Sequence, residues 1–236
     1  MLQRLAIAFS VVSLIAMSAT AGSNWESTGF TIAPKDVQSV IDATDKFMAT
    51  ETGKAMPGTL SFMARTVDGA DPATHSFLSS VDSIAEREKW TSTLQGNADW
   101  TALVDAVSEV SQIQATYRLG FDKNWGDTGD DDTHWELHLI SVKNPAKYVE
   151  ALDVLMASSA SEKFPGSLWL SSVMAGGNNP VSHVVSVGYA SAAEAEAWND
   201  PLVKTQAWAD FLAATEKVSE FRGTILMRTL KTWGTP

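Results

Sequence analysis

The sequence contains two copies of one pattern at a constant offset. Pro57-Gly58 recurs as Pro165-Gly166, and the two copies align without a gap. Further pairs at the same offset are Gly69 and Gly177, Pro72 and Pro180, His75 and His183, Trp90 and Trp198, Trp100 and Trp208, and Trp125 and Trp233. Because tryptophan is rare, three tryptophan pairs in one register indicate a duplicated unit. Each unit is about the size of a small domain and is too long for a solenoid repeat.

Each copy predicts the same order of strands and helices. Apolar residues recur at intervals of three and four in 37–48 and 148–156, which is typical of an amphipathic helix. A Pro-Gly pair ends that helix, and a turn rich in Gly, Pro, Asn and Asp then separates two strands. Capping boxes at 83–86 and 191–194 begin a second helical region. The predicted strands are 28–32, 60–66, 74–81 and 113–121 in the first copy, and 135–142, 168–173, 182–189 and 224–230 in the second.

The element order β-α-β-β-α-β predicts an α+β protein made of two tandem ferredoxin-like repeats. The second helical region is expected to break at 96–97 in the first copy and at 199–201 in the second. A sheet of this kind has helices on one face only, so we expect the two bare faces to close against each other. The predicted segments are a signal peptide at 1–21, a first repeat at 22–126, an acidic linker at 127–133 and a second repeat at 134–236.

In its element order, its duplication and its tryptophan-bearing second helix, the chain resembles the dimeric α+β barrel superfamily in a fused form. That superfamily includes antibiotic-biosynthesis-monooxygenase-like (ABM-like) and NIPSNAP-like proteins. The resemblance implies an intramolecular barrel with a pocket between the two sheets, or between each sheet and its helices. Such pockets bind small, often aromatic molecules or haem. No catalytic motif of the superfamily matches named residues here, and a shared fold does not by itself imply a function.

Residues 1–21 have the pattern of a secretory signal. Arg4 supplies a positive charge, residues 5–17 are apolar but too few to span a bilayer, and 19–21 fit a cleavage site. We therefore expect an exported chain, periplasmic or secreted, that begins near Gly22 and has no membrane span. The absence of cysteine excludes disulfides and cysteine-ligated metals. With 17 basic and 28 acidic residues, the chain is not expected to bind nucleic acid.

The strand that opens the second copy carries His134, Glu136 and His138 on one face and apolar residues on the other. We expect the apolar face to lie under the helices, so that the polar face points towards the opposing sheet or solvent. The neighbouring strand would add His183 to that polar face. Imidazoles and a carboxylate on alternate strand residues can hold a divalent cation, so His134, Glu136 and His138 are a candidate metal site.

The first copy does not keep this set, because the offset of the repeat gives Glu26, Thr28 and Phe30 as its counterparts. Only His183 has a histidine counterpart, His75. Two other interpretations therefore stay open. The polar residues can belong to a partly solvated strand, with His75 and His183 as hydrogen-bonded core residues, or a neutral histidine can act as an acid or base.

Two strand arginines and one tryptophan are further candidates. The alternation of residues along their strands places Arg118 and Arg228 on the sheet face that carries no helices. There a guanidinium can bind the carboxylate or enolate of a ligand, neutralise Glu136, or simply protrude at the rim of the barrel. Arg65 has no arginine counterpart and is expected at the surface. Trp169 has no tryptophan counterpart and is a candidate for lining a pocket.

Three interpretations of function remain. The first is an exported small-molecule-binding barrel that acts as a cofactor-independent monooxygenase or isomerase on a small apolar or aromatic ligand. Its candidate catalytic residues are His183 and Arg228, and its candidate ligand-binding residues are His75, Arg118, His134, Glu136, His138 and Trp169. The second is a protein that binds a divalent metal or haem through His134, Glu136, His138 and His183. The third is a non-catalytic interaction protein. The sequence identifies no cofactor and no oligomeric state beyond an internal pseudo-dimer.

Overall fold

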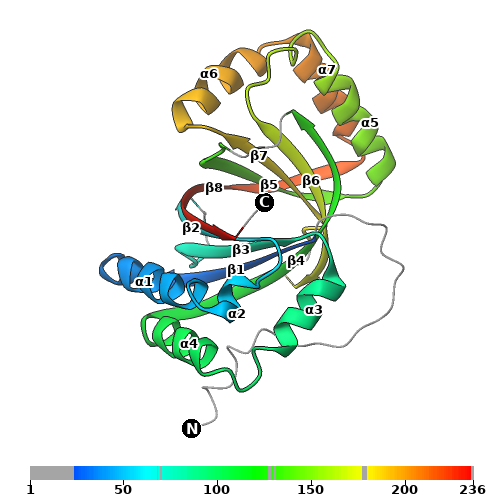
Figure 1. Ribbon diagram of the computed structural model, residues 1–236. Helices are drawn as coiled ribbons and strands as arrows, with labels where there is room; N and C mark the ends of the chain where they lie inside the picture. The colour runs from blue at the N-terminus through cyan, green and yellow to red at the C-terminus, as the bar shows by residue number, and fades with distance from the viewer. Residues whose placement is uncertain are drawn as a thin grey trace.

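Each half of the chain forms the expected βαββαβ unit (Figure 1). The computed structural model describes residues 24–67, 69, 71–126, 129, 131–176 and 180–234. The predicted signal peptide and positions 127, 128 and 130 of the predicted linker lie outside the described residues. The first half contains β1 (Asn24–Ile32), η1 (Pro34–Asp36), α1 (Val37–Met48), α2 (Glu51–Lys54), β2 (Thr59–Val67), β3 (His75–Val81), α3 (Ile84–Ser92), α4 (Ala98–Val110) and β4 (Ser111–Gly126). The second half contains β5 (His134–Val142), α5 (Pro145–Met156), β6 (Ser167–Gly176), β7 (His183–Tyr189), α6 (Ala192–Leu202), α7 (Gln206–Thr215) and β8 (Ser219–Gly234).

Side-chain caps mark the start of most of the helices, α1 excepted. Ser83 and Ser191 each accept a hydrogen bond from the backbone N–H three residues later, as the capping boxes predict. The predicted break at 199–201 is wrong, because α6 continues through these residues to Leu202. The break falls after Leu202, and α7 then begins at a cap of its own, Thr205.

The eight strands form one closed antiparallel barrel in the order β1-β3-β2-β8-β5-β7-β6-β4. The strand order within each half is that of a ferredoxin-like sheet. The two halves join along β2–β8 and along β4–β6, and the helices cover the outside of the barrel on opposite sides (Figure 1). Closure pairs both edges of each sheet, which confirms an intramolecular dimeric α+β barrel.

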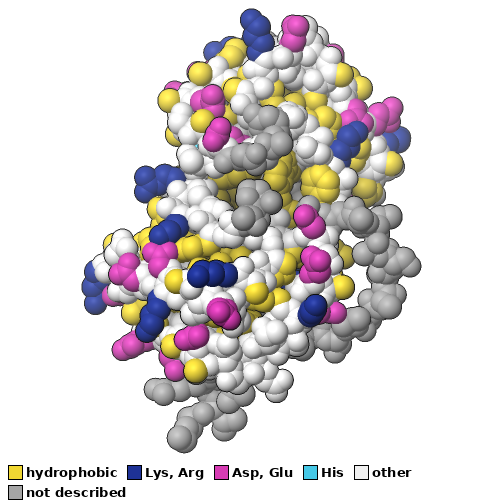
Figure 2. Space-filling view, in the orientation of Figure 1, with side chains coloured by type: hydrophobic (Ala, Val, Ile, Leu, Met, Phe, Trp, Pro, Cys, Tyr) yellow, Lys and Arg dark blue, Asp and Glu magenta, His cyan; other side chains and the backbone are white. Residues whose placement is uncertain are grey.

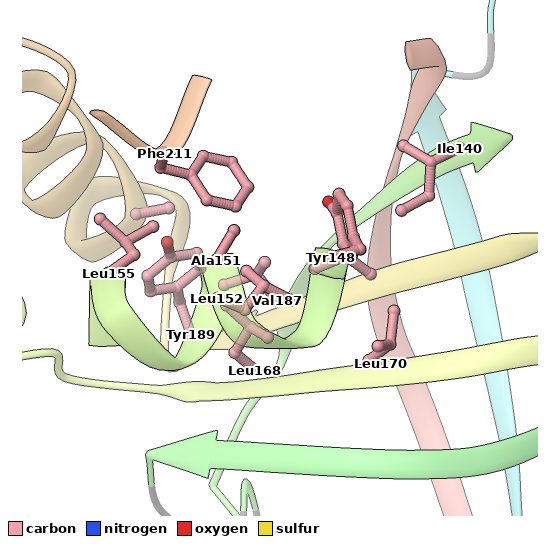
Figure 3. Close-up of a cluster of buried hydrophobic side chains, with 12 residues drawn as sticks. Ile140, Tyr148, Ala151, Leu152, Leu155, Leu168, Leu170, Val187, Tyr189 and Phe211 are labelled. Carbon is pink, nitrogen blue, oxygen red and sulfur yellow. The ribbon is translucent and has the colours of Figure 1, made fainter. Parts of the chain in front are cut away.

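The two faces of each sheet have different surroundings. In the second half, a hydrophobic cluster between the sheet and the helices contains Leu152, Leu170, Tyr189 and Phe211 (Figure 3). The first half has a corresponding cluster around Phe62. Since successive strand residues point to opposite faces, the residues that alternate with these clusters point into the barrel.

Matched contacts join the two halves at their seams. At the end of β4 and of β8, a lysine and a tryptophan donate hydrogen bonds of 2.6–2.8 Å to an aspartate on a helix of the other half. These sets are Lys123 and Trp125 with Asp153, and Lys231 and Trp233 with Asp45. The bonds hold the pKa of both aspartates below its ordinary value. The repeat therefore preserves the contacts that close the barrel.

The constant offset is wrong for the first strand of each half. Glu26 faces Ser79 on β3, whereas Glu136 faces Val187 on β7, which is the repeat counterpart of Ser79. The offset between β1 and β5 is larger, because four residues that include η1 separate β1 from α1 and only two separate β5 from α5. The counterpart of Glu136 is therefore Glu26. The other counterparts are Asn24 and His134, Trp25 and Trp135, Thr28 and His138, and Phe30 and Ile140.

The visible surface in Figure 2 carries Lys and Arg side chains scattered among Asp and Glu, with hydrophobic side chains in the middle of the face, between the two halves. Within the described ranges, each helix is too short or too polar to cross a bilayer.

Candidate functional site

The polar face of β5 lies under the helices and not inside the barrel. Glu136 and Ile140 share this face, and Ile140 packs in the cluster between the sheet and the helices. Trp135 points the other way and contacts Trp169 at a ring distance of 6.1 Å. The predicted orientation is wrong because a closed barrel covers both faces of the strand. An apolar face can then lie inside the barrel as readily as under the helices.

Glu136 is the centre of a group of polar side chains that we call the Glu136 cluster: Glu136, His138, Tyr189 and Asn199. Asn199 of α6 donates to both carboxylate oxygens of Glu136, at 3.2 and 3.3 Å. Its own carbonyl oxygen accepts from the Tyr189 hydroxyl at 3.2 Å. The Asn199 amide is thereby oriented with its donor towards the carboxylate.

The carboxylate of Glu136 is unusually ready to hold a proton. Its side chain is only 16% exposed, and this burial raises its pKa above the ordinary value for glutamate. The nearby His134 and the Asn199 hydrogen bond oppose the shift without cancelling it. Burial also raises the pKa of Tyr189, so its phenol stays protonated and remains a donor to Asn199.

His138 is the second titratable group of the cluster. Its Nδ1 lies 2.9 Å from the Thr224 hydroxyl, and its Nε2 lies 3.7 Å from Glu136 Oε2. Burial lowers its pKa, so the neutral imidazole is the favoured form. One third of its side chain is nevertheless exposed.

The counterpart of Glu136 in the first half has a different environment. Glu26 forms an ion pair of 2.8 Å with Arg87 of α3, and Arg118 of β4 lies 3.8 Å from the same carboxylate oxygen. In the second half these two arginines are replaced by Ala195 and Leu226. Both halves thus keep a buried carboxylate, but among the described residues no lysine or arginine forms an ion pair with Glu136.

His75 and His183 lie away from the Glu136 cluster. Both are buried, and each has Nδ1 2.9 Å from the hydroxyl of the preceding residue, Thr74 or Ser182. Burial lowers the pKa of both imidazoles. His75 also stacks on Phe62. These contacts fit hydrogen-bonded core histidines, and the catalytic role of His183 stays a prediction without a substrate-facing contact.

The arginines lie where the sequence did not place them. In the strand register Arg118 lies opposite Glu26 and Arg228 lies opposite His134. Both arginines are therefore on the helix side of the sheet and not on its bare face. Arg228 is exposed there. Arg65, predicted at the surface, has a side chain only 4% exposed and lies inside the barrel, where it contacts Asp71 at 2.6 Å and Ser76 at 2.9 Å. Its buried charge is stable because Asp71 neutralises it.

Trp169 lies in an aromatic cluster inside the barrel. Its ring is 4.5 Å from Trp25, 6.1 Å from Trp135 and 6.3 Å from Phe121, so residues of both halves meet here. The indole N–H groups of Trp25 and Trp169 are buried without a hydrogen-bond partner among the described residues. Edge-to-face packing brings ring edges against ring faces, which allows weak N–H···π contacts. A ligand-binding role of Trp169 stays a prediction.

Solved structures with the same architecture are similar over almost the whole chain. A "putative monooxygenase" from Lactobacillus acidophilus NCFM superposes with a TM-score of 0.64 at 14% identity, covering 89% of this chain and 95% of that one. An anthrone oxidase-like protein gives 0.56 at 13% identity, covering 91% and 93%. A mutant chlorite dismutase from Candidatus Nitrospira defluvii gives 0.51 at 11% identity, covering 90% and 93%. No protein-family model and no curated protein matches the sequence.

The chain shares the fold of the dimeric α+β barrel superfamily.

The surroundings of the histidines decide whether the metal or haem considered from the sequence fits this chain. Within the described part of the chain, which includes all four histidines, no three His, Asp or Glu side chains are placed to hold one metal ion. The histidines lie on strands β3, β5 and β7, and His138 Nε2 has the Glu136 carboxylate beside it. This arrangement gives the predicted metal site at His134, Glu136 and His138 no support, and we derive no step through a metal or haem.

The sequence pattern singles out Glu136 and His138 but not Tyr189 and Asn199. Asn199 lies in the segment that predicts a helix break, and Tyr189 ends a predicted strand without any further signal. A groove between α1 and α4, lined by Phe47 and Leu103 among others, contains none of the predicted site residues.

Proposed function

We propose that the chain binds a small organic molecule against the Glu136 cluster and that Glu136 accepts a proton from it. The observation that supports this most directly is the contrast between the halves. Among the described residues Glu136 has no lysine or arginine partner and its pKa is raised by burial, and a carboxylate with a raised pKa is a stronger base than an ordinary glutamate.

The surroundings of the cluster define the class of substrate. The strand neighbours of Glu136 are Val187 and Leu226, and Phe221 lies 6.5 Å from the ring of His138. A small apolar or aromatic molecule with one acidic C–H or O–H group suits such a surface. When Glu136 takes that proton, the substrate becomes an enolate or phenolate, and the partly exposed His138 can donate a hydrogen bond to its oxygen through Nε2.

Two reactions begin with this step. In an isomerisation, Glu136 returns the proton to a different carbon of the substrate. In a cofactor-independent oxygenation, dioxygen oxidises the substrate anion. The shared fold of structures named as a monooxygenase and as anthrone oxidase-like supports the second reaction as a candidate.

Anthrone is a suitable probe because it is a small aromatic ketone with an acidic C–H. We expect the protein to accelerate exchange of that hydrogen in D₂O, measured by NMR, and the Glu136→Gln variant to lose about a hundredfold or more of this rate. Glu150→Gln, on an exposed position of α5, is the matched control and should exchange like the wild type. No acceleration by the wild type, or an unchanged rate in Glu136→Gln, would contradict the proposal.

We also propose that the chain is exported after cleavage following Ala21. This rests on the pattern of residues 1–21 alone. Intact-mass measurement of protein recovered from the periplasm or medium should give Gly22 as the first residue. Protein that retains Met1 in the cytoplasm would contradict the proposal.

A further inference from the structure

The first half carries a second charged group at the place that corresponds to the Glu136 cluster. Glu26, Arg87 and Arg118 meet on the outer face of the sheet beneath α3. Two guanidinium groups surround one carboxylate, so the group has a net charge of +1. We call it the Arg87 site.

One donor of Arg87 is unused. Its Nη2 binds Glu26 at 2.8 Å, but its Nη1 is buried and has no hydrogen-bond partner among the described residues. A buried N–H group without a partner is costly, and most such groups in proteins bind an oxygen of the protein, of water or of a ligand. The side chain is only 13% exposed, so its position is fixed by packing.

Arg118 can supply a second donor. At 3.8 Å its Nη2 is too far from Glu26 for a hydrogen bond, and 41% of its side chain is exposed. Its guanidinium can therefore turn towards a bound anion while it stays close to the pair. Two guanidinium groups match the two oxygens of a carboxylate.

We propose that the Arg87 site binds a small organic carboxylate, and that Arg118 turns aside to admit it, so that one oxygen reaches Arg87 Nη1 and the other binds Arg118. The single excess positive charge matches one negative charge. A dianion such as phosphate would carry an extra charge against Glu26, which disfavours it. The second half has Ala195 and Leu226 at these positions, so this site is distinct from the Glu136 cluster and does not depend on the function proposed there.

Benzoate is the probe, and benzamide is its neutral equivalent. Titration calorimetry and thermal unfolding at pH 7 should show benzoate binding in the range up to about 10 mM, and benzamide should bind much more weakly. Arg118→Leu copies the residue of the second half, and Arg87→Lys keeps a charge beside Glu26 but lacks the forked donors. Both variants should bind benzoate about tenfold more weakly or worse.

The control Arg222→Ala removes an arginine that pairs with Glu220 on the surface of β8, and it should bind benzoate like the wild type. Glu136→Gln should also bind it normally, which separates this site from the proposed function. Undetectable benzoate binding by the wild type, equal binding of benzamide, or unchanged affinity in both Arg118→Leu and Arg87→Lys would overturn the proposal. Because Arg118 is partly exposed, its variant keeps the test valid if Arg87→Lys does not fold.

Discussion

Neutralising Glu136 and its counterpart Glu26 should change the free energy of unfolding in opposite directions. Glu136→Gln removes a buried charge that has no arginine partner, whereas Glu26→Gln removes one member of a buried ion pair. Because burial raises the pKa of Glu136, its ionised form costs the folded state free energy at pH 7. Since Asn199 can still donate to the new amide oxygen, we expect Glu136→Gln to increase the free energy of unfolding at pH 7, by about 1 kcal/mol as is typical of a single stabilising substitution.

Glu26→Gln should lower the free energy of unfolding by about 3 kcal/mol, because it leaves the guanidinium of Arg87 buried without its countercharge. The side chains of Arg87 and Glu26 are only 13% and 11% exposed, so solvent screens the pair little. Urea denaturation of the wild type and both variants at pH 7 measures the two effects in one experiment.

The pH dependence separates charge from packing. A raised pKa means that the folded protein holds its proton more strongly than the unfolded chain, so wild-type stability falls as pH rises from the unfolded glutamate value to the folded one. The advantage of Glu136→Gln should be complete above the folded-state pKa and should disappear below about pH 4, where the wild-type carboxyl is neutral in both states. If Glu136→Gln loses as much stability as Glu26→Gln, or keeps its advantage at about pH 3, the ionised carboxylate of Glu136 does not destabilise the folded protein, contrary to this prediction.

The seam contacts and the interior cluster give further expectations. Trp233→Phe removes the donor to Asp45 and should cost about 1.5 kcal/mol in urea denaturation; Trp125→Phe should cost the same, and the double variant should cost the sum of the two. The pKa of Asp45 is lowered mainly by its hydrogen bond from Lys231, so Asp45→Asn should lower the melting temperature at pH 7, an effect that should vanish as pH falls through the lowered pKa. Trp169→Ala should cost about 3 kcal/mol, because it leaves a cavity among the packed rings of Trp25, Phe121 and Trp135.

Local signals predicted the fold correctly. Apolar spacing, capping boxes and Pro-Gly turns act over a few residues, and the duplication provided each of them twice. The constant offset nevertheless hid a two-residue difference before α1. The three tryptophan pairs at the constant offset lie after that point in each half and do not report the difference, whereas Trp25 and Trp135 lie before it and do not align at that offset. The constant offset therefore aligns Glu26 with His134 instead of Glu136.

The orientation of the polar strand could not be obtained from alternation alone. In a sheet with one solvated face, the apolar side is the buried side, but both sides of β5 are covered. Arg65 and Arg118 show the same difficulty. The position of Arg65 depends on Asp71 in the connection between β2 and β3, and that of Arg118 depends on Glu26, which is distant in the sequence. Such ion pairs leave no periodic pattern in the sequence.

Comparing the two halves separates residues that close and pack the barrel from residues that belong to a candidate site. Both halves keep the lysine, tryptophan and aspartate that hydrogen-bond at the seam. They also keep a histidine bonded to the preceding hydroxyl, His75 or His183, and a tryptophan inside the barrel, Trp25 or Trp135. These are requirements of closure and packing, which apply equally to each half. The carboxylate is also kept, but its neighbours Arg87 and Arg118 are replaced by Ala195 and Leu226. A barrel closed by two equivalent seams can tolerate a desolvated carboxylate such as Glu136 in one half, because the other half and both seams still stabilise the barrel. Chemistry is therefore expected where the halves differ, at Glu136 and at Arg87, and not where they agree.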